Sequence, residues 1–185
     1  MTPQDFFKYY APYAESTQVK YGVPASITLA QAALESSWGT SGLTTSANNF
    51  FGIKADKSWK GQSTAMPTQE FVNGAYVTVN AGFRKYNSAQ DSFNDHAKFL
   101  IDNGRYKKLF SLQVTDYIGW AQGLKSAGYA TDPTYDSKLI NLVTKYNLTQ
   151  YDKAAVVKKK IRMVAFILIG AVAIGAIGLF FFKGK

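Results

Sequence analysis

The chain has 185 residues, a net charge of +9, no cysteine and a single histidine, His96. This length accommodates one domain of ordinary size and an additional segment. The absence of cysteine excludes disulfide frameworks and thiolate zinc sites, and the presence of only one histidine argues against a His-rich metal site or a Ser-His-Asp triad. We therefore expect neither a metal nor another cofactor.

The positive charge is concentrated at the C-terminal end. Residues 1–150 carry fourteen Lys/Arg and eleven Asp/Glu, a balance of +3, whereas residues 151–185 carry seven against one, a balance of +6. A basic tail favours a membrane surface as the partner, and residues 1–150 show no Lys/Arg stripe with interleaved aromatics. We expect no nucleic-acid partner.

The first twenty residues lack the basic start and the apolar stretch of a signal peptide, so none is expected. Aromatic residues recur there at helical spacing, which predicts an amphipathic first helix. They are Phe6, Phe7, Tyr10 and Tyr13.

A second helix is predicted between Pro24 and Gly39, with Glu35 in its last turn beside an apolar stripe. Burial and the carbonyl end of the helix would both raise the pKa of Glu35. A carboxyl that keeps its proton near neutral pH is what a general acid for glycoside cleavage needs. On the helix alone, a salt-bridged or solvated Glu is the commoner interpretation. The stripe consists of Ile27, Ala30, Leu34 and Trp38.

The segment 48–54 combines amides and aromatic rings, among them Asn48, Asn49 and Phe51. Amides hydrogen-bond sugar hydroxyl and acetamido groups, and rings cover apolar sugar faces, so the segment suits a carbohydrate groove. An ordinary structural loop has the same composition.

Residues 66–84 predict a β-hairpin around the Asn73-Gly74 turn. A two-residue turn pairs Glu70 with Val77 and puts this acid on a mostly apolar face, which breaks the expected pattern. Rule-breaking of this kind is typical of functional sites. The alternative is a register shifted by one residue, which would turn every side chain to the other face.

Three further helices follow in the sequence pattern. The first starts at the N-cap Ser88 and ends at Gly104, with His96 as a structural residue and Asp95 on the solvated face. The second spans 115–127, and the third runs from Asp132 to about Tyr146.

Residues 163–182 are twenty residues without a charge, which predicts a transmembrane helix of roughly 30 Å. We thus divide the chain into a domain at 1–150, a basic linker at 151–162, the span at 163–182 and a short basic tail at 183–185.

Five motifs in this order resemble glycoside hydrolase family 73, the β-N-acetylglucosaminidases of peptidoglycan. They are LAQAALESSWG (29–39), NNFFGIK (48–54), TQE (68–70), FRKY (83–86) and GYATDP (128–133). The resemblance implies a mainly α, α+β fold: a lysozyme-like helical domain with a β-hairpin lobe, here with one C-terminal transmembrane helix added. The implied activity is that of an endo-β-N-acetylglucosaminidase, which cleaves the N-acetylglucosaminyl-β-1,4-N-acetylmuramyl bond of peptidoglycan glycan strands.

The resemblance also assigns roles to residues. It makes Glu35 the general acid, Glu70 the second catalytic carboxylate and Tyr129 a residue lining the catalytic site. Asn48, Asn49 and Phe51 match groove-shaping positions, and we add Trp38 from the same motif as Glu35 as a substrate-binding residue.

Two other functions fit the sequence. A lytic transglycosylase would need Glu35 but no base that activates water. A glycan-binding structural membrane protein would keep the fold without turnover.

The basic residues before the span place the 1–150 domain in the cytoplasm by the positive-inside rule, away from peptidoglycan. A phage protein held by a single-pass anchor in the virion or host inner membrane, acting at entry or lysis, is a hypothesis that resolves this conflict. A bacterial protein translocated despite these charges is the alternative.

Overall fold

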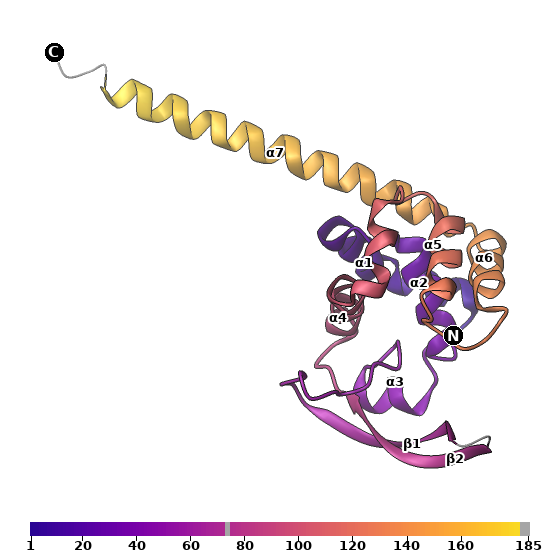
Figure 1. Cartoon of the computed structure of the whole chain (residues 1–185). Coiled ribbons are helices and arrows are strands. Elements are labelled where there is room, and N and C mark those ends of the chain that lie inside the picture. Colours follow the sequence, from indigo (N-terminus) through magenta and orange to yellow (C-terminus); the bar gives the residue numbers. More distant parts are fainter. Residues whose placement is uncertain (73–74, 182–185) are drawn as a thin grey trace.

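The computed structural model describes the backbone of residues 1–72 and 75–181, and the side chains of residues 1–68 and 77–165. A helical body and a two-stranded hairpin form two lobes (Figure 1). The helices are α1 (Pro3–Tyr21), α2 (Ala25–Glu35), α3 (Gly42–Ala47), α4 (Ala89–Asp102), the 3-10 helix η1 (Gly104–Ser111), α5 (Tyr117–Ser126), α6 (Tyr135–Lys145) and α7 (Thr149–Phe181). The strands are β1 (Ser63–Val72) and β2 (Ala75–Arg84).

Helix α2 lies at the centre of the helical body. It contacts α1, α5, α6 and α7, and every residue from Ala25 to Ala33 is buried. The sequence pattern predicted one apolar stripe, but this helix is covered on all sides because its small residues let neighbouring helices approach closely. Its last residue, Glu35, is therefore held by a rigid support.

The start of α2 is capped by side chains from other helices. Pro24 provides no side-chain cap; instead Gln18 Oε1 of α1 accepts from Ala25 N at 2.7 Å, and Asp152 Oδ1 of α7 accepts from Ser26 N at 2.8 Å. Two of the free N–H groups at the start of α2 are thus satisfied by side chains of α1 and α7.

The hairpin has the predicted register. Strands β1 and β2 are antiparallel, and Glu70 is the partner of Val77. The one-residue shift considered above is therefore excluded. The Asn73-Gly74 turn and the Glu70 side chain lie outside the described residues, so the face that this carboxylate takes stays a prediction.

The other predicted helices are confirmed with small shifts at their ends. Ser88 caps α4 by accepting from Asp91 N at 3.2 Å, and α4 ends at Asp102, two residues before Gly104. The sequence pattern missed η1, whose i→i+3 turns have no 3.6-residue periodicity.

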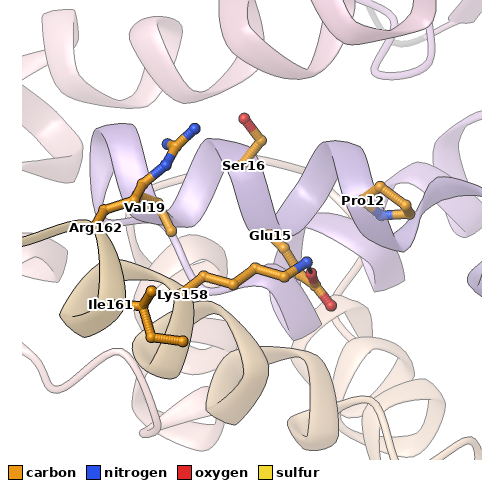
Figure 2. A pocket seen from close by; sticks show the side chains of 7 residues that line it. All are labelled: Pro12, Glu15, Ser16, Val19, Lys158, Ile161 and Arg162. Atoms are coloured by element: carbon orange, nitrogen blue, oxygen red, sulfur yellow. Dashed lines mark hydrogen bonds and ion pairs between the residues drawn. The ribbon is translucent and has the colours of Figure 1, made fainter. Parts of the chain in front are cut away.

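Helix α7 begins fourteen residues before the predicted span. Its first turns pack on α1 and α2, with Asp152 and Ala155 buried. Figure 2 shows Lys158 of α7 extending along the α1–α7 groove to an ion pair with Glu15 of α1. From there α7 runs away from the body on the side opposite the hairpin (Figure 1). Residues of α7 beyond the predicted 1–150 boundary thus contribute to the core.

The predicted transmembrane helix is the part of the fold class that is wrong. Within the described residues, no helix has both the length and the apolar composition needed to cross a membrane. The helical domain with its hairpin lobe is the part of the prediction that is confirmed.

Candidate active site

Glu35 is the last residue of α2 and is partly buried. Its Oε1 accepts a hydrogen bond of 2.9 Å from the Tyr135 hydroxyl at the start of α6. Burial raises the pKa of Glu35, and the bond from Tyr135 offsets part of this effect because it stabilises the carboxylate. The structure therefore gives Glu35 the raised pKa that its position in the sequence predicted.

Glu35 lines a cavity of about 490 Å³ between the helical body and the loop that leads to the hairpin. Aromatic, backbone and charged groups face the same space, the mixture that binds sugar rings together with their polar substituents. The other lining residues are Phe51, Gly52, Ile53, Lys54, Asp56, Phe99, Arg105, Tyr106, Tyr129 and Ala130.

Two rings that line this cavity, Tyr129 and Phe51, are each stacked on a second ring behind them. Tyr129 stacks on Tyr135 with ring centroids 5.6 Å apart, and Phe51 stacks on His96 at 3.9 Å. The edge contact of His96 with Tyr129, at 6.0 Å, joins the two pairs. Burial and the nearby Glu35 raise the pKa of Tyr129, so its phenol stays protonated and can donate a hydrogen bond.

His96 supports the ring of Phe51 as a neutral ring. It is fully buried, and burial lowers its pKa to about 3. Among the described residues, neither ring nitrogen has a hydrogen-bond partner. The position agrees with the structural role that the sequence analysis gave to His96.

The two predicted asparagines hold the loop that carries Phe51. Asn49 is buried; its Oδ1 accepts from Phe51 N and Ile53 N, and its Nδ2 donates to Arg84 O at 2.8 Å. Asn48 donates to Tyr86 O at 3.0 Å. Both amides face backbone groups, so they act on the cavity through the loop, whereas Phe51 lines it directly.

Trp38 lies apart from this cavity. It turns away at a left-handed φ of 60°, and its ring packs between Phe6, Phe7 and Tyr146. It borders a second hollow of about 560 Å³, formed by the end of α2 and by α6. The structure thus places Glu35, Phe51 and Tyr129 around one cavity and Trp38 at another.

The sequence analysis did not single out Gln31, Tyr135 or the contacts of Asp95. Gln31 lies four residues before Glu35, a spacing that puts both on one helix face and could have indicated it. Asp95 was expected in solvent, but it accepts from Arg84 Nη1 at 2.8 Å and from the Tyr86 hydroxyl at 2.7 Å. This pair of contacts fastens the end of β2 to α4.

Known proteins are similar to the part of the chain that forms this cavity. The sequence model of a glucosaminidase family, described as mannosyl-glycoprotein endo-beta-N-acetylglucosaminidase, matches residues 11–148. Peptidoglycan hydrolase FlgJ of Vibrio parahaemolyticus is 43% identical over 147 residues, 78% of this chain and 47% of the relative. Exo-glucosaminidase LytG of Bacillus subtilis is 39% identical over 155 residues, 81% of this chain and 54% of the relative. The chain therefore spans about half the length of these two curated relatives.

Solved structures show the same fold. The catalytic domain of the autolysin Auto from Listeria monocytogenes has 38% identity and a TM-score of 0.73, covering 82% of this chain and 88% of that one. A C-terminally truncated glycoside hydrolase domain of FlgJ from Salmonella typhimurium has 35% identity and a TM-score of 0.64, covering 79% and 98%.

Proposed function

Because the chain belongs to the glucosaminidase family, glycoside hydrolase family 73, and is a glycoside hydrolase, we propose that its substrate is the glycan strand of peptidoglycan. The bond cleaved is the N-acetylglucosaminyl-β-1,4-N-acetylmuramyl linkage. The names of the relatives support the substrate, since FlgJ is named a peptidoglycan hydrolase and LytG an exo-glucosaminidase.

The observation that carries the proposal is the environment of Glu35. A partly buried carboxyl with a raised pKa, at the edge of a cavity walled by aromatic rings, is suited to protonate a leaving sugar oxygen. In this mechanism Glu35 gives its proton to the glycosidic oxygen as the bond to the anomeric carbon breaks. Phe51 offers a ring to a sugar face, and the phenol of Tyr129 offers a hydrogen bond to a sugar substituent. Glu70, as the second carboxylate, would activate the attacking water or stabilise the anomeric carbon.

The test is Glu35→Gln, measured on purified peptidoglycan by the release of reducing ends. We expect the rate to fall by ~10²–10⁴, the usual loss when a general acid is removed. Asp102→Asn is the matched control, because it removes an exposed carboxylate at the end of α4 and should leave the rate unchanged. An active Glu35→Gln variant would place the acid elsewhere. An inactive parent that still binds glycan would favour the non-catalytic alternative.

A further inference from the structure

Three groups in a row connect the core of the helical body to Glu35. Gln31 Nε2 donates to the Tyr135 hydroxyl oxygen at 2.9 Å, and the Tyr135 hydroxyl donates to Glu35 Oε1 at 2.9 Å. Gln31 and Glu35 both belong to α2, one helical turn apart, and Tyr135 comes from α6. Two residues of α2 are therefore connected to each other through one residue of α6.

This row is rigid. Gln31 is fully buried and Tyr135 is 2% exposed. Stacking on Tyr129 fixes the Tyr135 ring, and the position of Tyr135 as the first residue of α6 fixes its backbone. Groups held in this way lose little freedom when they orient a neighbour, which is the basis of preorganisation.

The direction of the two bonds determines which oxygen of Glu35 carries the proton. The Gln31 amide nitrogen can only donate, so the Tyr135 oxygen is the acceptor and its own hydrogen must point to Glu35 Oε1. An oxygen that accepts this bond is the carbonyl oxygen of the protonated carboxyl. The proton is then carried by Oε2, to which the structure assigns no hydrogen bond among the described residues.

We propose that Tyr135 and Gln31 are positioning residues that hold the Glu35 carboxyl with Oε1 as acceptor and Oε2 as the oxygen that delivers the proton. This inference rests on the proposed role of Glu35 as general acid. In the transfer, the Oε2–H bond breaks as the proton joins the glycosidic oxygen, and the negative charge left on the carboxylate is stabilised by the Tyr135 hydroxyl.

The first variant is Tyr135→Phe, which keeps the ring stack on Tyr129 and removes only the hydroxyl. We expect kcat to fall by about 10- to 100-fold, the scale of a misplaced catalytic group, with KM within about two-fold of the parent value. Without the donor, the pKa of Glu35 rises further, so the alkaline limb of the kcat profile should move to higher pH. Tyr146→Phe is the matched control, because it removes a hydroxyl from the residue that follows α6. We expect it to leave the rate and the pH profile unchanged.

A second variant separates positioning from a purely structural role. Tyr135→Phe leaves the buried Gln31 amide without its partner, which also lowers the melting temperature. Adding Gln31→Leu replaces that amide by an apolar group of similar size. We expect the double variant to recover the parent melting temperature but not the parent kcat, because Glu35 still lacks the hydrogen bond from the Tyr135 hydroxyl. Recovery of both quantities, or an alkaline limb that stays at the parent pH in Tyr135→Phe, would overturn the inference.

The Glu35→Gln variant, measured in parallel, separates the proposed role of Glu35 as general acid from the positioning role of Tyr135 and Gln31. If Glu35→Gln is inactive and Tyr135→Phe behaves as the parent, only the positioning role fails. If Glu35→Gln remains active, the proposed function fails first.

Discussion

At the scale of single residues, two opposing effects set the pKa of Glu35. Partial burial at the end of α2 disfavours its charged form, and the hydroxyl of Tyr135 favours it. Burial is the larger of the two, so Glu35 keeps its proton to higher pH than an exposed carboxyl would. The same burial lowers stability once the group ionises, because the carboxylate loses water that the cavity wall does not fully replace.

The raised pKa of Glu35 predicts that, as the pH rises, activity falls while the stability of Glu35→Gln relative to the parent increases. Because the proposed general acid Glu35 would act in its protonated form, we expect activity to decline as the pH rises through the raised pKa of this group. The pKa of Glu35 is higher in the folded than in the unfolded chain, so its stabilising contribution is fully present below the unfolded pKa and is lost as the pH rises through the folded pKa. The Gln side chain does not titrate, so the variant lacks this pH dependence. We therefore expect the melting temperature of Glu35→Gln minus that of the parent to increase as the pH rises from about 4 to 8. A difference that stays constant over this range would contradict the assignment.

At the scale of secondary-structure elements, the central helix depends on a partner from the far end of the domain. Asp152 of α7 lies 126 positions from Ser26, whose N–H it accepts, and is fully buried. Gln18 of α1 donates to the backbone oxygen of Asp152 at 3.0 Å, so α1, α2 and α7 meet at one point. The helix that carries Glu35 at one end is thus fixed by α7 at the other.

The titration of Asp152 offers a measurement on this junction. Burial raises its pKa to about 6, so its contribution to stability is present at acid pH and is lost as the pH rises through that value. Holding the charged form at neutral pH costs about 3 kcal/mol. Asp152→Asn keeps an Oδ1 acceptor for Ser26 N without the charge. We expect its unfolding free energy to be flatter between about pH 4 and pH 7 than that of the parent.

The exposed change Asp102→Asn serves as the control for charge removal. Urea unfolding of the three proteins at each pH gives the comparison. Parallel curves for Asp152→Asn and the parent would mean that Asp152 does not titrate in this range.

At the scale of the whole molecule, the cavity lies where two lobes meet. The helical body supplies Glu35 and Tyr129, and the loop before the hairpin supplies Phe51. Backbone bonds from Ala55 N to Gly82 O and from Arg84 N to Ile53 O tie this loop to β2. The hairpin that carries Glu70 is therefore joined to the loop that walls the cavity.

The role of Glu70 can be determined from the products. A hydrolase that uses Glu70 to activate water should lose most of its turnover in Glu70→Ala, by ~10²–10⁴ for a lost base. A lytic transglycosylase should be affected mildly, and its products, lighter by one water, would appear in the mass spectrum of the parent digest. Hydrolysed products at a near-parent rate from Glu70→Ala would exclude Glu70 as the second catalytic group.

The sequence by itself determined the elements whose signals are local. Apolar spacing, the N-cap Ser88 and the Asn-Gly turn signal correctly indicated the hairpin register and five helices, α1, α2, α4, α5 and α6, but neither α3 nor η1. The motif around Glu35 placed this acid at a helix end and indicated the family. Each of these features depends on residues close together in the chain, which is why pattern and spacing were sufficient.

Only the tertiary structure decided which residues share a site. Tyr135 reaches Glu35 across 100 positions and Gln31 across 104, and no periodicity encodes such contacts. Trp38, three residues after Glu35, borders a different hollow, because Ser37 and Trp38 take left-handed backbone angles after the end of α2. Asn49 was predicted to shape a sugar groove, and only the structure shows that its amide bonds to backbone groups of the loop, because a buried loop must satisfy its own N–H and C=O groups. The uncharged stretch at 163–182 predicted a membrane span that the described residues do not bear out, and α7 instead begins within the core, where Asp152 meets Ser26.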